Sequence, residues 1–244
     1  RELIWVFGMA IYLVLMMEGF MGYVLPWGQL SYWGANVIVS LAGAIPVIGD
    51  DLLVWVRGDY LISGATLNRF FALHVVALPI VLIALVVLHL LALHEVGSNN
   101  PDGIDIKKNK GPDGIPLDAV PFHPYYTLYH DLSGVVLFLF VFCTIVFFAP
   151  EMGGYFLELS NFQEANSLKT PEHVPPVWYF TPFYSMLRAV TYPLFGIDAK
   201  FWGMLVMFGA IAILFVLPWL DKSPVRSMRY KGAYSRVALL LFVV

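Results

Sequence analysis

Residues 66–94, which read TLNRFFALHVVALPIVLIALVVLHLLALH, are the stretch that decides the fold. From Phe70 to Leu93 the sequence is almost wholly apolar. More than about twenty apolar residues, rising about 1.5 Å each, are enough to cross a bilayer core about 30 Å thick. The stretch nevertheless carries His74 and His89. A polar side chain costs free energy in such surroundings, so each imidazole needs a partner or a function.

His74 and His89 lie fifteen residues apart in this predicted helix. At about 100° and 1.5 Å per residue, they are about 60° from alignment and about 22 Å apart along the axis. Two imidazoles at two depths of one helix are suited to hold one axial position in each of two haems. Hydrogen-bonded packing is the alternative for each histidine, and the pair alone does not decide between them. Pro79 lies between them and predicts a bend that changes the residual angle.

The composition excludes an ordinary soluble domain. Mean hydropathy is +0.76, hydrophobic residues make up 59% of the chain and charged residues only 13%. These values indicate a polytopic membrane protein. The single cysteine, Cys143, lies within another apolar run, so this chain predicts neither an internal disulfide framework nor a cysteine metal site. A net charge of −3 gives no sign of nucleic-acid binding.

The apolar pattern predicts an all-α transmembrane helix bundle with four spans and the start of a fifth. The spans are expected at residues 3–25, 70–93, 126–148 and 201–217. The chain begins at Arg1, one residue from an apolar run, and stops inside another, so we expect an internal fragment of a longer protein. Thr66 is expected to cap the central helix, and short helices are expected at 37–44, 51–56 and 184–192.

The lysines and arginines predict the orientation in the membrane. The connections at 94–121 and 221–236 carry eight of them, whereas those at 26–65 and 149–200 carry four. The first pair of connections is therefore expected on the cytoplasmic or matrix side, and the two long connections outside. His74 then lies toward the outer surface and His89 toward the inner one.

Small and acidic residues in the first span are the other unusual feature. Gly8, Gly19 and Gly22 leave room for a neighbouring helix or a flat ligand to come close. Glu18 lies one turn before Gly22 on the same face. Either this carboxylate stays hydrated near the surface, or it exchanges protons beside a cavity.

Five ordered motifs resemble one family. They read GYVLPWGQLSYWGANVI at 22–38, ATLNRFFALH at 65–74, LHEVGSNNPDG at 93–103, PFHPYYTLYHDL at 121–132 and PPVWYF at 175–180. The sequence resembles the cytochrome b family of quinol:cytochrome c oxidoreductases (cytochrome bc1 complexes), over its whole length. The fifteen-residue histidine interval is shared with plastid relatives of the b6 type. Those relatives end after the helix that carries the histidines, so the further spans here favour the bc1 type.

The resemblance implies two b-type haems. His74 would ligate the outer, low-potential haem iron and His89 the inner, high-potential one, while the other axial histidines would lie before Arg1. Gly8 and Gly22 would let the haems approach the first span. Arg69 would neutralise a haem propionate or, alternatively, cap the membrane interface.

The resemblance also implies an outer quinol-oxidising site, whose family motif is Pro-Glu-Trp-Tyr. Here Val177 replaces the glutamate that is thought to accept a quinol proton. Quinol oxidation releases two protons, so Glu18 is the substitute acceptor that we expect, with Glu172 as a weaker competitor. The other residues expected to line this site are Gly22, Tyr23, Pro176, Trp178 and Tyr179.

The family's inner quinone-reducing site maps to His94 and Asp131. An imidazole and a carboxylate that flank a quinone ring can bind its carbonyls and deliver protons. Ser98 and Asn99 are expected in the wall of this site or, alternatively, in the solvated loop. His130 is either an additional donor or a surface residue.

The implied protein is a membrane oxidoreductase subunit with a Rieske iron–sulfur protein and a cytochrome c1-type subunit as partners, in a homodimeric, proton-translocating complex. A bacterial inner membrane is the expected location. The expected division is a haem-binding part at 1–95, a loop at 96–122 and a C-terminal domain at 123–244. The alternatives are a two-haem membrane anchor of another dehydrogenase and a proton or ion transporter.

Overall fold

The structure, a computed structural model, describes residues 1–98, 100, 102, 104–117, 119–225 and 227–243, and it is all-helical apart from three isolated β-bridges within these ranges. Four helical runs are long and apolar enough to cross a membrane, at Glu2–Val24, Gly64–Val96, Thr127–Phe148 and Ala199–Leu220. They confirm the all-α class and the four predicted spans. A shorter apolar helix, α9 (Ala233–Val243), lies where the fifth was expected to start.

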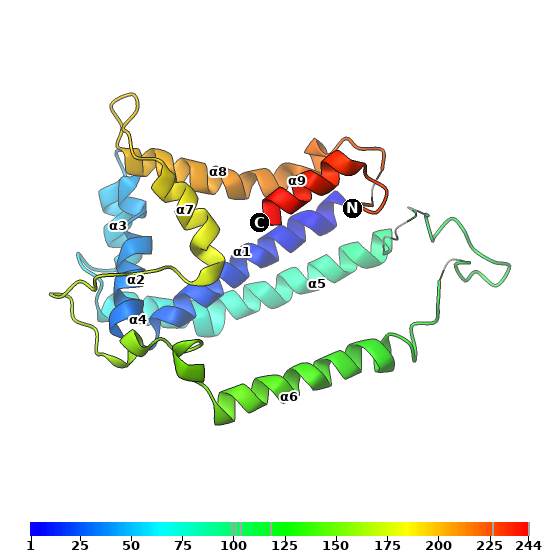
Figure 1. The fold of residues 1–244 in the computed structure, drawn as a ribbon, viewed down its shortest axis with the longest axis horizontal. Coiled ribbons are helices and arrows are strands. Elements are labelled where there is room, and N and C mark those ends of the chain that lie inside the picture. The colour runs from blue at the N-terminus through cyan, green and yellow to red at the C-terminus, as the bar shows by residue number, and fades with distance from the viewer. Residues whose placement is uncertain (99, 101, 103, 118, 226, 244) are drawn as a thin grey trace.

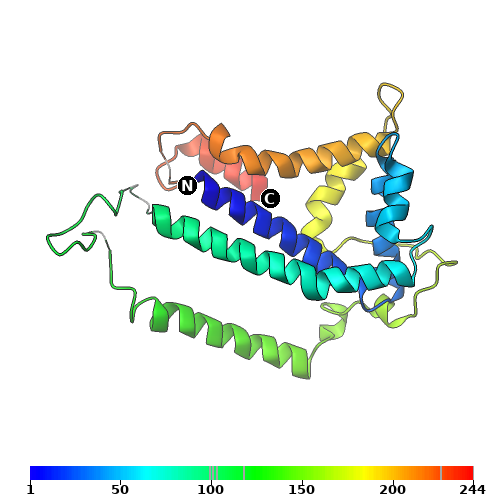
Figure 2. The same ribbon diagram turned by 180° about the vertical axis from the view of Figure 1, so that it is seen from behind.

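The long helices run side by side, as Figure 1 shows. Helix α1 (Glu2–Val24) packs antiparallel along α5 (Leu78–Val96), and α8 (Ala199–Leu220) lies on the other side of α1. The Trp5 Nε1–H donates to the Leu214 carbonyl at 2.7 Å and joins α1 to α8. Helix α6 (Ser133–Phe148) stands apart from the other spans in both views (Figures 1 and 2). Its apolar side chains are consequently exposed.

The central helical run has three parts. It begins as α4 (Gly64–Ala72), continues through a π-helical segment at Leu73–Ala77, and becomes α5. The predicted cap at Thr66 is wrong, because Ser63 is the N-cap and accepts from the Ala65 N–H. Thr66 is fully buried at the third helical position, where its hydroxyl donates to the Arg57 carbonyl at 2.7 Å. The two residues together form a capping box.

The bend predicted at Pro79 stays a prediction, and a π-helical segment directly precedes this part of the helix. The Leu78 N–H donates to the Leu73 carbonyl five residues back, which is the π-helical bond. Proline has no N–H, and its ring clashes with the carbonyl four residues earlier in a regular α-helix. For Pro79 that carbonyl belongs to Val75, inside the π-helical segment.

The short helices were predicted less well than the spans. The helix expected at 37–44 is wrong, because α2 runs over Gln29–Val39 and only a short 3₁₀ turn follows at Ala42–Ala44. The expected helix at 51–56 is confirmed by α3 (Gly49–Arg57). The helix expected at 184–192 lies three residues earlier, as α7 (Thr181–Ala189), with Pro182 in its first turn.

Helix α2 begins so early because its first turn is held by a distant loop. The Gln29 side-chain amide accepts from the Asn166 N–H at 2.7 Å and donates to the Lys169 carbonyl. The Ser31 N–H donates to Asn161 Oδ1 at 2.8 Å. Gln29 and Ser31 are buried. These contacts fasten the long connection after α6 against the start of α2.

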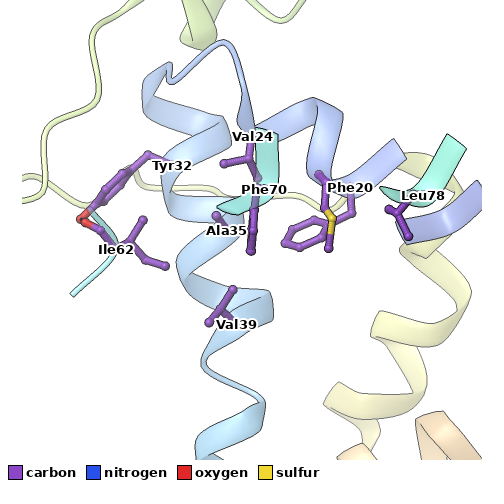
Figure 3. Packing of buried hydrophobic residues seen from close by; sticks show 9 residues of the cluster. Phe20, Val24, Tyr32, Ala35, Val39, Ile62, Phe70 and Leu78 are labelled. Carbon is purple, nitrogen blue, oxygen red and sulfur yellow. The ribbon is translucent and has the colours of Figure 1, made fainter. Parts of the chain in front are cut away.

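The apolar core lies at this same end of the bundle, and Figure 3 shows its packing. The end of α1, one face of α2 and the start of the central run meet there. The Phe20 and Phe70 rings pack edge to face with centroids 5.7 Å apart. The buried members of this core are Phe20, Met21, Val24, Tyr32, Ala35, Val39, Ile62, Phe70 and Leu78.

The opposite end of the bundle holds the two basic connections. They follow α5 and α8, and both lie beyond the start of α1 (Figure 1). The Tyr230 hydroxyl donates to Asp102 Oδ1 at 2.6 Å and links the two connections. The hydrogen bond raises the pKa of the Tyr230 phenol. The Lys231 ammonium lies 2.7 Å from Asp221 Oδ2 and lowers the pKa of that carboxyl. The arrangement agrees with the predicted sidedness, in which both connections face the cytoplasm.

We expect a cysteine at exposed Leu168 to react with a membrane-impermeant maleimide in right-side-out vesicles, and one at exposed Asn109 to react only after permeabilisation. Mass-tag gel shifts measure the labelling, in the full-length protein with Cys143 replaced by Ser. The reverse pattern of labelling contradicts the predicted orientation.

Candidate functional site

The end of α1 beside the core holds His74 against a glycine. A Cβ atom built on Gly22 would lie 2.5 Å from His74 Cε1, so the imidazole occupies the space that a side chain at position 22 would fill. Only glycine permits this approach without displacing the ring. The contact fixes the level of His74 on α1.

Glu18 also contacts the His74 imidazole. His74 Nδ1 lies 3.0 Å from the Glu18 carbonyl oxygen and 3.2 Å from Glu18 Oε1. Glu18 Oε2 is buried and has no hydrogen-bond partner among the described residues. With Nδ1 engaged in this way, the other ring nitrogen, Nε2, is the one left for a ligand bond. The carboxylate is therefore not simply a hydrated surface group.

His89 repeats the contact toward the other end of the helix pair. A Cβ atom built on Gly8 would lie 3.4 Å from His89 Cε1. Both residues line a cavity of about 410 Å³, together with Trp5, Met9 and Leu93. His89 Nδ1 is buried and unpaired within the described part of the chain. A mostly apolar cavity with one unsatisfied ring nitrogen has the character of a ligand site.

Polar residues gather around the end of α1 near His74. A Cβ atom on Gly19 would lie 2.5 Å from the Tyr179 hydroxyl oxygen, so this phenol packs on the α1 backbone. Burial raises the pKa of Tyr179. The Tyr23 hydroxyl donates to Glu158 Oε2, in a hydrogen bond between α1 and the loop after α6. One tyrosine of α1 and one from the segment before α7 therefore lie near the end of α1.

Sequence reasoning missed Glu158. It is one of several acidic residues in a long polar connection, and nothing in its neighbours marks it as different from a solvated carboxylate. Its half-buried position depends on the docking of that loop onto α2, where Asn161 packs against Gly28. The only available signal was the length of the connection, which is typical of a functional loop.

The Pro176–Tyr179 motif is only partly turned toward α1. Tyr179 reaches Gly19, and the next residue, Phe180, packs edge to face on Phe20 at 6.5 Å between centroids. Pro176 and Val177 are half-buried. Trp178 is 82% exposed, and its ring packs edge to face on Tyr179 with centroids 5.7 Å apart. The role expected for Trp178 as a lining residue thus stays a prediction.

Arg69 is held in place by the chain before it. Its guanidinium packs over Gly58, where a Cβ would lie 2.6 Å from Cζ, and Nη1 donates to the Trp55 carbonyl. Gly58 has a positive φ of 75° at the end of α3, where it forms the helix C-cap. These contacts fix the guanidinium beside the end of α3, and both roles expected for Arg69, at a propionate or at the membrane interface, stay predictions.

The residues expected at the inner quinone site are exposed. His94 lies in the last turn of α5 and Ser98 just beyond it. Asp131 is in the π-helical segment Thr127–Leu132 before α6, and its Oδ1 lies 2.7 Å from His130 Nδ1. Within the described ranges, no hydrogen bond or ion pair joins Asp131 to His94. Asn99 lies outside the described residues, and the inner site stays a prediction.

Together these features define a membrane helix bundle with a histidine–glycine contact toward each end of one helix pair. Comparison of the sequence with known families then gives two matches. Residues 1–155 match the family "Cytochrome b(N-terminal)/b6/petB", and residues 164–244 match "Cytochrome b(C-terminal)/b6/petD". The chain belongs to the cytochrome b family, which confirms the resemblance found in the sequence.

Individual relatives agree with this assignment. The chain is 61% identical to cytochrome b of Allochromatium vinosum over 248 residues, which covers 100% of this chain and 59% of that protein. It is 47% identical to cytochrome b of Rickettsia prowazekii, with coverage of 100% and 56%. The chain thus spans less than two thirds of the length of these relatives.

A solved structure of similar fold is a chain of the "Hyperthermophilic respiratory Complex III". It shares 38% identity with this chain at a TM-score of 0.81, and the match covers 100% of this chain and 59% of that one. The likeness confirms the fold.

The observed contacts fit the haem b that this family binds. A flat macrocycle needs an imidazole nitrogen and backbone that can come close, and His74 and His89 each lie against a glycine. The cavity beside His89 and the hydrogen bonds of His74 Nδ1 add to this fit.

Replacing Gly22 with Ala is expected to displace the His74 ring, because the added Cβ would lie 2.5 Å from Cε1. By analogy with the loss of other groups that orient metal ligands, we expect haem retention at His74 to weaken about 10-fold or more. Haem b content per mole of full-length protein measures the effect. Gly134→Ala, where no atom lies within 4 Å of the added Cβ, is the control. Equal haem contents in the two variants contradict the assignment.

Proposed function

We propose that the protein is the cytochrome b subunit of a respiratory bc1 complex, a quinol:cytochrome c oxidoreductase. In this role it oxidises quinol at an outer site and passes electrons through two b-type haems to an inner quinone-reducing site, with coupled proton translocation. The observation that carries the proposal is the pair of histidine–glycine contacts, His74 with Gly22 and His89 with Gly8, in a member of the cytochrome b family.

In this proposal, His74 ligates the outer, low-potential haem iron and His89 the inner, high-potential one. A haem with two imidazole ligands supplies reversible one-electron transfer without an open coordination position. The Glu18 carbonyl and carboxylate next to His74 Nδ1 make this imidazole a more basic ligand, which favours the oxidised iron. His89 Nδ1 has no such partner in the described chain. This difference supports the assignment of the low potential to His74.

At the proposed outer site, Glu18 accepts a quinol proton at Oε2. Val177 cannot bind a proton, whereas Glu18 Oε2 is buried and unpaired among the described residues. Tyr179 packs at Gly19, one residue from Glu18, and its raised pKa keeps the hydroxyl protonated and able to donate to a quinol oxygen. Glu158 supplies a second carboxylate through its hydrogen bond with Tyr23. The remaining lining residues in this proposal are Gly22, Pro176, Val177 and Trp178.

At the proposed inner site, His94 and Asp131 bind the quinone carbonyls and supply protons, with Ser98 in the wall. His94 lies in the last turn of α5 and Asp131 precedes α6, so the two flank the connection that joins these helices. An imidazole and a carboxylate are both suited to deliver protons to a reduced quinone.

The proposed partners are a Rieske iron–sulfur protein and a cytochrome c1-type subunit, in a homodimeric complex embedded in the lipid bilayer. The proposed location is the inner membrane of a bacterium. The support is the similarity to bacterial cytochromes b and to a chain of a respiratory complex III. We retain the division into a haem-binding part at 1–95, a loop at 96–122 and a C-terminal domain at 123–244 as part of the proposal.

A redox-titrated visible spectrum of the full-length protein in membranes tests the two haem assignments. We expect two b-type components at separate potentials in the wild type. His74→Ala should remove the low-potential component and His89→Ala the high-potential one, because each substitution removes one axial ligand.

The same titration, repeated with inhibitors of each quinone pocket, distinguishes the alternatives. A spectrum without any b-type component would mean that both histidines serve in packing, and it would favour a proton or ion transporter. Two haems that respond to inhibitors of only one quinone pocket would favour a membrane anchor of another dehydrogenase.

Glu18→Gln tests the proton acceptor, because glutamine keeps the shape of the side chain but accepts no proton. We expect quinol turnover to fall about 10²-fold, the lower end of what a positioned acid or base contributes. The His74-linked spectral component should remain, because the Glu18 carbonyl still accepts from Nδ1. Steady-state turnover of the full complex measures the effect.

Glu172→Gln is the matched control, since this exposed carboxylate is the competing acceptor. Unchanged turnover in Glu18→Gln contradicts the proposed role of Glu18. A loss confined to Glu172→Gln would transfer that role to Glu172.

A further inference from the structure

The two histidine–glycine contacts join two helices whose contacting residues are spaced differently along the chain. Gly8 and Gly22 are fourteen residues apart on α1, whereas His89 and His74, which face them, are fifteen apart on the central run. The two helices run antiparallel and pack along each other. One helix therefore carries one residue more than the other between the same two levels.

In a regular α-helix, one extra residue mainly changes the direction in which a side chain points around the helix axis. Fourteen residues are two heptads, or four turns at about 3.5 residues each, and keep one seam of a helix against its neighbour. Fifteen residues over the same four turns need about 3.75 per turn, more than the 3.6 of an α-helix. The extra residue would rotate one histidine by about 100° from the seam on which the other lies.

The π-helical segment at Leu73–Ala77 lies where this extra residue must be accommodated. A π-helical turn, closed here by the bond from the Leu78 N–H to the Leu73 carbonyl, holds one residue more than an α-helical turn. His74 is inside the segment, and the less exposed residues Leu78, Leu82, Leu85 and His89 then follow at intervals of three or four. The helix is therefore in α-helical register from Leu78 to His89.

Pro79 explains why the wide turn occurs at this end. Without an N–H, Pro79 makes no bond to the Val75 carbonyl, and its ring disfavours that carbonyl in the α-helical position. The cost of leaving α-helical geometry is thus lowest in the turn just before Pro79, which is the turn of His74.

We propose that the π-helical segment is a register device that absorbs one residue, so that His74 and His89 face Gly22 and Gly8 at the same time. This inference rests on the proposed function, because the two histidines are its haem ligands. The histidine interval itself is then not essential. An interval of fourteen fits a continuous α-helix, whereas an interval of sixteen would need a second wide turn.

Deletion and insertion at one position test the device in the full-length protein. Val75 and Val76 are identical neighbours, about half exposed, so removing either gives the same chain and takes away no core side chain. We expect ΔVal76 to keep both b-type components at wild-type stoichiometry in a redox-titrated spectrum. Inserting one valine between them should lose at least one component, because one wide turn cannot absorb two residues.

Two further variants separate register from damage to the helix. ΔVal87 shortens the same interval at another exposed site, and should also retain both components. The valine insertion combined with ΔVal87 restores fifteen residues and should recover both. The proposal is supported if at least one deletion variant keeps both b-type components, the insertion variant loses at least one, and the combined variant recovers both.

Loss of a component from both deletion variants overturns the register device, as does retention of both in the insertion variant or no recovery in the combined one. These outcomes are distinct from failure of the proposed function, which would appear as the absence of two b-type components in the wild-type protein.

Discussion

The rest of the structure depends on the contact of two imidazoles with two glycines across one pair of antiparallel helices. Because Gly22 and Gly8 carry no side chain, His74 and His89 lie directly against the α1 backbone. The contacts fix how closely α1 approaches α5 and at what level each ring lies. In the proposed register device, the π-helical segment serves the same requirement, since it absorbs the extra residue between the two histidines.

The end of the bundle near His74 is built to hold polar groups in place. The aromatic core around Phe20 and Phe70 fixes the end of α1 relative to the central run. Buried hydrogen bonds from Gln29 and Ser31 dock the long connection after α6, and that loop brings Glu158 to Tyr23. This packing supports the proposed outer site, because a reacting group gains most when its partners are fixed in advance.

The sequence was sufficient for the spans and the family, because long apolar runs and ordered motifs are strong signals. It was insufficient where distant segments decide local structure. Helix α2 starts at Gln29, earlier than expected, since its polar first turn is held by residues more than a hundred positions later. Glu158 could not be singled out for the same reason. Glu18 was recognised as unusual, but its contact with His74 requires the helix pairing.

The two ends of the helix pair differ in how far their polar groups are organised. Near His74, Glu18, Tyr23 and Tyr179 are held by backbone or side-chain contacts and are at least partly buried. Beyond His89, His94 and Asp131 are exposed, and no hydrogen bond joins them in the described part of the chain. A site with fixed partners suits a step whose protons must leave in a set direction. A site formed from exposed groups gains its order when a ligand bridges them, so its affinity includes the cost of that ordering.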